Sequence, residues 1–271
     1  MTRRTRLMLV MSLLGVSAGS AQTRPQIGSG VKHARASVEA LSATSNRARV
    51  LVTLAVDPGW HVSWRNPGET GLPTRLTWTL PGGVRVHRER WPVPIVSHTP
   101  VGATHTLEGD VPWVVEFAVD SATPADRLVS LTIRYGICRE VCIPEQVTVQ
   151  GVLPGRAMSR AVAIPPVVEA RLTTDAGRIA ARRLSPTVIC LDRVPVPLSA
   201  PVPEFVSDSG VGLDAAIPLQ ARTGRAAGSA LLTVPATHAR ISGLQALFVR
   251  GGAGVWATLD FRQPARRCAV K

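Results

Sequence analysis

Apolar and polar residues alternate through much of the chain between positions 31 and 153. The alternation is clearest in five runs, at residues 47–56, 74–80, 112–119, 128–137 and 143–152. Turn signals such as Asp57-Pro58-Gly59 and Pro81-Gly82-Gly83 separate the runs. A period of two between turns is typical of half-buried strands. Several short strands at this spacing predict an antiparallel β-sandwich.

The pattern changes between residues 154 and 186, where alanine, arginine and proline replace the alternation. We expect a linker with one or two short helices there. A second strand-rich region follows at residues 187–271, with alternating runs at 187–196, 229–236 and 254–261 among others. The sequence therefore predicts an all-β protein in which a sandwich, residues 22–153, precedes a second, smaller β domain.

The first 21 residues have the organisation of a cleaved secretory signal peptide. Three arginines in the first six residues precede an apolar run at 7–16 and a small-residue exit, Gly19-Ser20-Ala21. The apolar run is shorter than the about 20 residues that span a bilayer. We therefore expect an exported chain, without a membrane span after cleavage near Ala21, in a compartment where disulfides persist.

Composition narrows the classes of partner. The chain has 31 Lys and Arg against 18 Asp and Glu, a net charge of +13, and almost all of its basic residues are arginine. An arginine excess suits an acidic partner, but a GC-rich genome produces the same bias. No cluster of five basic residues occurs, and aromatic residues make up only 4%. The sequence therefore does not predict a nucleic-acid surface.

Cys138 and Cys142 lie four positions apart in the stretch YGICREVCIPEQ. Four extended residues span about 13 Å, whereas bonded cysteines have Cα atoms about 4.4–6.8 Å apart. The pair therefore requires a helical turn or a hairpin. In a hairpin, apolar residues face apolar ones and polar residues face polar ones, as with Ile137 opposite Ile143 and Thr132 opposite Thr148. This register places both cysteines on the polar face, at the hairpin tip.

The cysteine pair has three open interpretations: an inert staple, a redox pair or a Cu(I) clip. The loop lacks the glycine usual at its left-handed position, and Val141 would fit that conformation badly, so a strained and labile bond is one expectation. Two thiolates suit Cu(I), with His98 or His105 assisting. No second cysteine pair or paired-histidine motif supports a metal site, so we predict none. Cys190 and Cys268 are interpreted as a long-range structural disulfide.

Three ordered motifs carry a family resemblance: DPGWHVSWRNPGETGLPTRLTWTLPGGV, RWPVPIVSHTP and YGICREVCIPEQ. Together they resemble the N-terminal periplasmic domain of the thiol:disulfide interchange protein DsbD family, most closely its suppressor-of-copper-sensitivity type. The resemblance covers residues 31–153 and implies an immunoglobulin-like antiparallel β-sandwich in the periplasm. The membrane and thioredoxin-like domains of full-length family members have no counterpart in this sequence, so a stand-alone module is expected.

The resemblance also implies a function. Cys138 and Cys142 would be the catalytic thiols of a thiol:disulfide oxidoreductase of the protein-disulfide reductase type, which needs no cofactor. Cys142 would form the mixed disulfide and Cys138 would resolve it. The implied partners are a separate membrane-embedded electron donor and periplasmic thioredoxin-fold proteins. The alternative is a non-enzymatic secreted β-sandwich that binds a protein partner or copper and uses the pair as a staple.

Family members shield these cysteines with a cap loop that carries an aromatic residue. The corresponding stretch of this sequence, residues 95–107, has none. Ile95, His98 and Val101 are therefore the candidates for shielding. The two tryptophans of the first motif, Trp60 and Trp64, share strand parity and are expected in the core.

Overall fold

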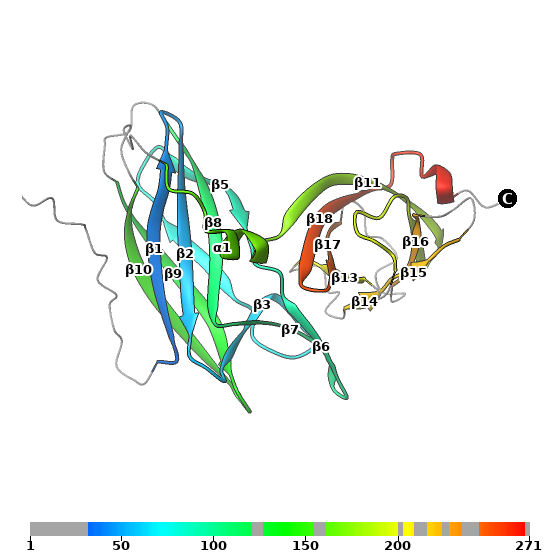
Figure 1. The fold of residues 1–271 in the computed structure, drawn as a ribbon, viewed down its shortest axis with the longest axis horizontal. Coiled ribbons are helices and arrows are strands. Elements are labelled where there is room, and N and C mark those ends of the chain that lie inside the picture. Colours follow the sequence, from blue (N-terminus) through cyan, green and yellow to red (C-terminus); the bar gives the residue numbers. More distant parts are fainter. Residues whose placement is uncertain are drawn as a thin grey trace, which may run out of the picture.

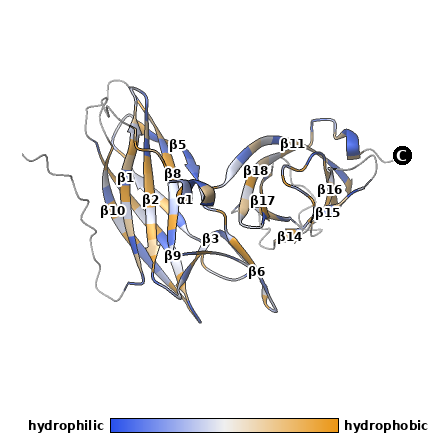
Figure 2. Ribbon diagram, viewed as in Figure 1, coloured by the Kyte–Doolittle hydropathy of each residue, from blue (hydrophilic) through white to orange (hydrophobic). Residues whose placement is uncertain are grey.

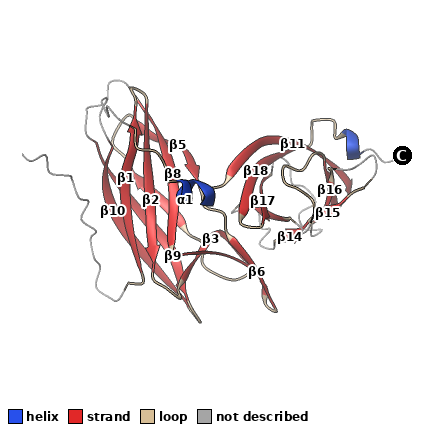
Figure 3. Cartoon of the chain, in the orientation of Figure 1, coloured by secondary structure: helices blue, strands red, loops and turns tan. Residues whose placement is uncertain are grey.

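A computed structural model describes residues 32–120, 127–153, 161–199, 203–208, 216–223, 228–234 and 244–268. Within these residues the protein consists almost entirely of strands, arranged as two β regions that follow one another along the chain (Figures 1 and 3). The predicted signal peptide, residues 1–21, lies outside the described residues.

The first β region is a sandwich of two antiparallel sheets. One sheet has the order β1 (Ala34–Ala43), β2 (Arg47–Val56), β8 (Asp110–Val119) and β5 (Val84–Arg90). The other has the order β10 (Cys142–Leu153), β9 (Arg127–Cys138), β3 (His61–Gly68), β7 (Gly102–Glu108) and β6 (Ile95–Thr99), and β4 (Arg75–Thr79) also pairs with β9. The five strands predicted from alternation are all present, with bounds within two residues of those expected.

The core of the sandwich consists of buried apolar residues of these strands, and Val206, Leu247 and Val249 of the second region pack with them. Figure 2 shows apolar residues spread along the strands. Val52, Trp113 and Leu131 come from different strands and are fully buried. Burial of a large apolar side chain contributes about 1.5–3 kcal/mol, so the alternation fixes which face of each strand points inward. Trp64 is fully buried as expected, whereas Trp60 is only half-buried.

The second β region is one sheet in which strands from both ends of the region are neighbours. Its order is β14 (Ile217–Pro218), β13 (Glu204–Ser207), β17 (Gln245–Arg250), β18 (Ala253–Asp260), β11 (Thr174–Ser185), β12 (Val188–Leu191), β16 (Ala230–Thr233) and β15 (Gln220–Ala221). β11 and β18 pair in parallel, and the other pairings are antiparallel. Phe205 and Phe248 pack edge to face in its own apolar core.

The predicted linker, residues 154–186, is shorter in the structure. In its described part, residues 161–186, one short helix, α1 (Pro166–Arg171), is followed by β11, so the second region begins at Thr174 and not at residue 187. Alanine and arginine are strong helix formers, but β11 is held by ladders on both sides, to β18 and to β12. Tertiary pairing therefore overrides the local preference.

A disulfide joins Cys190 of β12 to Cys268 at the end of the second region. The sulfurs are 2.06 Å apart, and both residues are fully buried. Ala265 packs against the pair. The bond closes a loop of 78 residues and therefore encloses most of the second region.

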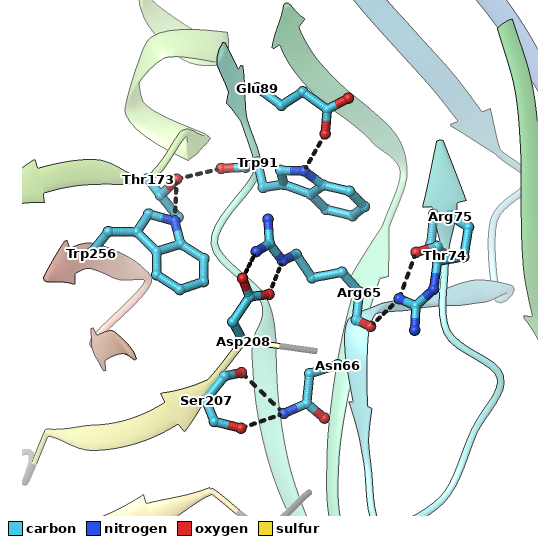
Figure 4. Close-up of polar contacts among 10 residues, drawn as sticks. All are labelled: Arg65, Asn66, Thr74, Arg75, Glu89, Trp91, Thr173, Ser207, Asp208 and Trp256. Atoms are coloured by element: carbon cyan, nitrogen blue, oxygen red, sulfur yellow. Dashed lines mark hydrogen bonds and ion pairs between the residues drawn. The ribbon is translucent and has the colours of Figure 1, made fainter. Parts of the chain in front are cut away.

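Arg65 of β3 is the centre of the joint between the two β regions (Figure 4). Its Nε donates to Asp208 Oδ1 of the second region at 2.6 Å, and its Nη2 contacts Asp208 Oδ2. The guanidinium carbon lies 5.0 Å from the ring centroid of Trp256, 5.4 Å from that of Trp91 and 5.8 Å from that of Trp64. A cation within about 6 Å of a ring is attracted to it, so three tryptophans and one carboxylate hold Arg65.

Two of the motifs that carry the family resemblance lie at this joint. Trp64 Nε1 donates to the carbonyl of Pro92, which links the W-x-N-P-G motif to the W-P-x-P motif. Asn66 Nδ2 donates to Ser207 of the second region, at 3.0 Å to its carbonyl. Gly68 has φ +87°, and a Cβ there would lie 2.2 Å from the carbonyl oxygen of Ala103. Of these contacts, the Asn66–Ser207 bond joins the two regions, and the other two hold the motifs in place within the sandwich.

Candidate redox site at the hairpin tip

β9 and β10 form the predicted hairpin. Cys138 pairs with Cys142, Ile137 with Ile143 and Thr132 with Thr148, which confirms the register expected from the alternation. The two threonine hydroxyls are hydrogen-bonded at 3.0 Å. Cys138 and Cys142 are joined by a disulfide with a Cα–Cα distance of 4.1 Å. The bond therefore lies at the end of the hairpin, beside a three-residue loop.

The two cysteines differ in accessibility. Cys138 is only 2% exposed, whereas Cys142 is half-buried, and the loop between them is exposed. The expectation that both cysteines are reachable on the polar face is therefore wrong for Cys138. β10 is an edge strand, whereas β9 lies between β10 and β3. Cys142 is therefore the more accessible of the two cysteines.

Leu72 lies over the same part of β9. A Cβ at Gly136 would be 2.7 Å from the Cβ of Leu72. Gly136 is two residues before Cys138 and on the same face of the strand. The segment after β3 therefore lies over the sheet next to Cys138, and a glycine at position 136 is what permits this close approach.

The loop itself shows no left-handed residue. Among the described residues, Arg193 is the one non-glycine residue with positive φ. The Arg139 N–H points to the carbonyl of Val141 at 3.4 Å. The expectation that Val141 stores strain in a left-handed conformation is therefore wrong.

Ile95, His98 and Val101 lie on the hairpin of β6 and β7, and all three are exposed. His98 Nε2 contacts Glu204 Oε1 of the second region at 2.8 Å. The β7 residue in the same row of the sheet as Cys138 is Glu108, which lies at the end of β7 remote from the β6–β7 turn. The structure does not bring these three side chains together with the cysteines, and shielding by them stays a prediction.

An aromatic side chain beside the loop comes from a different element. The Trp60 ring stacks on His33 with centroids 3.9 Å apart, and the Arg139 guanidinium carbon lies 5.8 Å from the Trp60 centroid. Sequence reasoning placed Trp60 in the core because of its parity with Trp64. The signal that could have located it is its position immediately before the strand that pairs with Cys138.

Tyr135 faces Glu145 in the same hairpin, and its hydroxyl donates to Glu145 Oε2 at 3.2 Å. Burial, and then the adjacent Glu145 carboxylate, raise the pKa of Tyr135 far above its usual value. The raised pKa means that the phenol stays neutral in the folded protein while an unfolded chain loses its proton. Folding stability is therefore expected to fall as the pH rises above about 10.

Tyr135 is the only tyrosine of the chain, so absorbance of phenolate near 295 nm reports on this residue alone. The midpoint of the titration is expected well above that of free tyrosine. Glu145→Gln should lower the midpoint only in part, because burial is the larger cause. A midpoint near that of free tyrosine in the folded protein would contradict the buried position.

No helix in the described ranges is long and apolar enough to cross a membrane. Nor do those ranges contain a cluster of three or more His, Cys, Asp or Glu side chains placed to hold a metal ion.

An antiparallel β-sandwich with a C-x3-C disulfide at a hairpin tip, followed by a second β region, defines the class of this protein. Residues 31–154 match the family described as "Thiol:disulfide interchange protein DsbD, N-terminal". The match covers the same part of the chain as the three motifs and bears out the resemblance that they carry.

Solved structures extend the comparison beyond that domain. The N-terminal periplasmic domain of ScsB from Proteus mirabilis has the same fold, with a TM-score of 0.56 and 18% sequence identity over 88% of this chain and 98% of that one. The yeast GGA1 GAE domain (TM-score 0.30, 11% identity, 49% of this chain and 99% of that one) is too distant to support an argument. None of the curated proteins compared with this chain matches it. The ScsB match spans both β regions, so the two-region architecture is shared.

Proposed function

We propose that this protein is a periplasmic thiol–disulfide exchange module that relays electrons through Cys138 and Cys142. A separate membrane-embedded protein reduces the pair, and the dithiol then reduces disulfides in thioredoxin-fold proteins. The family of residues 31–154 supports the chemistry, and the likeness to a periplasmic domain supports the compartment. The export signal at residues 1–21 and the domain bounds 22–153 and 187–271 belong to this proposal, the latter with the start of the second region moved to Thr174.

One observation carries the proposal: the disulfide is asymmetric. Cys142 is half-buried on an edge strand, and Cys138 is buried behind it. Exchange needs one sulfur that a partner can reach and a second that is held ready to displace the partner. Cys142 fits the first role and Cys138 the second. Val141 and Ile143 are exposed on either side of Cys142 and supply apolar area for a partner.

The reaction needs no cofactor, because both electrons stay on sulfur. The Cys142 thiolate attacks a partner disulfide, forms a mixed disulfide and releases one partner thiolate. Cys138 then attacks Cys142 Sγ, closes the intramolecular bond and releases the second partner thiolate. The protein loses two electrons and two protons, and the partner gains both.

The reduction potential tests this proposal. Purified protein is equilibrated with glutathione buffers, and free thiols at each cysteine are trapped by alkylation and assigned by peptide mass spectrometry. We expect the Cys138–Cys142 potential to lie above about −300 mV, since structural disulfides lie below that value. Cys190–Cys268 is the internal control and should stay oxidised in the same buffers.

The competing function is a staple in a non-enzymatic β-sandwich that binds a protein or copper, and the near-complete burial of Cys138 favours it. A Cys138–Cys142 potential below about −300 mV would support the staple and contradict electron transfer. The same titration repeated with Cu(I) present separates copper binding from exchange, because a bound ion protects both thiols from alkylation.

A further inference from the structure

Four side chains from neighbouring strands form one row across the second sheet of the sandwich. Cys142 of β10 pairs with Cys138 of β9, Cys138 pairs with His61 of β3, and His61 pairs with Glu108 of β7. Directly opposed residues in antiparallel strands point to the same face, with Cβ atoms about 4.5–5.5 Å apart. Two thiols, an imidazole and a carboxylate are therefore consecutive neighbours.

The next row shows to which face this group points. Val62 pairs with Ile137 on one side and with Leu107 on the other, and all three residues are buried in the core. Side chains alternate along a strand, so the row that contains His61 points away from the core. His61 is half-buried and Glu108 is exposed. The imidazole is thus the titratable side chain beside the less accessible cysteine.

We propose that His61 accepts the proton of the Cys138 thiol during disulfide exchange and that Glu108 is the carboxylate beside the resulting imidazolium. This inference rests on the proposed function. Burial disfavours a free thiolate, and Cys138 is buried, so its ionisation needs a proton acceptor on the same face. Glu108 pairs with His61 in the same row, so an imidazolium formed there would have a carboxylate on the neighbouring strand.

In the closing step, the proton passes from Cys138 to His61, whereas the electron pair passes to the partner sulfur. When a mixed disulfide joins Cys142 to a partner sulfur, the Cys138 thiol passes its proton to His61. The Cys138 thiolate attacks Cys142 Sγ, the Cys138–Cys142 bond forms, and the bond from Cys142 to the partner breaks. The electron pair of that bond leaves on the partner sulfur, which takes a proton from water. The imidazolium returns its proton to water.

Other charged groups also surround the hairpin tip. Arg134 and Lys32 donate to Gln146, and Arg171 donates to the carbonyl of Glu108. The hairpin also carries Arg139, Glu140 and Glu145, and His33 is paired with Asp57. Side chains of arginine, lysine and the carboxylates keep their charge between about pH 5 and 8, whereas imidazoles titrate there. His33 is therefore the residue that a control must separate from His61.

The test follows the two steps of exchange with oxidised glutathione as the probe. The reduced full chain is mixed with the probe, quenched with acid at intervals, and analysed by mass spectrometry for the Cys142–glutathione adduct and for the closed disulfide. His61→Gln is expected to form the adduct at the wild-type rate and to close it at least about tenfold more slowly at neutral pH. Its closure should accelerate as the pH rises, because hydroxide can then take the Cys138 proton in place of His61.

Three further variants sharpen the result. Cys138→Ser should accumulate the adduct without closing it, and His33→Gln should close as the wild type does. Glu108→Gln should slow closure a few-fold; because position 108 is exposed, this variant carries the test if His61→Gln does not fold. Closure of His61→Gln and Glu108→Gln at the wild-type rate and with the wild-type pH profile would overturn the inference, as would slow closure in His33→Gln alone.

The inference and the proposed function fail in different ways. If wild-type protein forms the Cys142 adduct and closes it, exchange chemistry stands whatever His61→Gln does. If wild-type protein forms neither the adduct nor the closed disulfide with glutathione, exchange through this pair is contradicted, and the assignment of His61 is contradicted with it.

Discussion

Loss of the Cys190–Cys268 disulfide is expected to destabilise the second β region by about 4.5 kcal/mol, because the chain-entropy model relates stabilisation to the length of the closed loop. The bond closes a loop of 78 residues. For a domain of 60–100 residues, about 4–8 °C of melting temperature corresponds to 1 kcal/mol, so the Cys190→Ala/Cys268→Ala variant should melt on the order of 20 °C lower. Scanning calorimetry of the purified variant measures the change.

The matched control is Cys138→Ala/Cys142→Ala. That bond spans only four positions, for which the same model gives about 2 kcal/mol at most. The sandwich also has its own large core, which does not depend on the hairpin tip. If the hairpin variant loses more stability than the Cys190→Ala/Cys268→Ala variant, then the C-x3-C pair is the structural bond and the proposed exchange function loses its physical basis.

The sandwich was predictable because its strands carry their own signal. β2, β8, β9 and β10 alternate, and most of their apolar residues are buried, whereas Leu128, Ile143 and Val152 are exposed. β11 was missed because its stability comes from two neighbours that are remote in sequence, β18 and β12. Its residues include several arginines and alanines, which are poor strand formers. A pairing between residues 174 and 255 has no local signature.

At the candidate site, too, the local feature was predictable from the sequence and the long-range feature was not. The register of the cysteine hairpin follows from cross-strand pairs within 30 residues, and it is confirmed. The burial of Cys138 depends on β3 and on the segment that carries Leu72, which approach from more than 60 residues away. The sequence pattern indicates which residues face each other in a hairpin, but it does not indicate what lies beside the hairpin.

Two of the three motifs that carry the family resemblance lie away from the disulfide. W-x-N-P-G and W-P-x-P identify the family, yet their residues lie at the joint, where Trp64 bonds to Pro92 and Asn66 bonds to Ser207. Of the three motifs, C-x3-C-I-P is the one that contains the disulfide. A characteristic motif in this chain therefore marks a place where two β regions meet as well as a place where chemistry occurs.

The ion pair of Arg65 and Asp208 should hold that joint together. Removal of one partner of a buried pair costs about 3–5 kcal/mol; these side chains are 21% and 22% exposed, so we expect about 2–3 kcal/mol for Asp208→Asn. The cost arises because Arg65 stays among three tryptophan rings without its carboxylate. Urea unfolding followed by tryptophan fluorescence measures it, since Trp64, Trp91 and Trp256 all report on the joint.

A double-mutant cycle separates the ion pair from the apolar contacts around it. Arg65→Met/Asp208→Asn should recover part of the stability that Asp208→Asn loses, which gives a coupling energy above about 1 kcal/mol. Arg88 and Asp175 form the matched control pair, because they also join the two regions but are 53% and 51% exposed. Exposed pairs contribute about 0–1 kcal/mol. Equal coupling energies for the two pairs would show that the apolar contacts of Val206, Leu247 and Val249 with the sandwich core, and not the charge on Arg65, fix the second region in place.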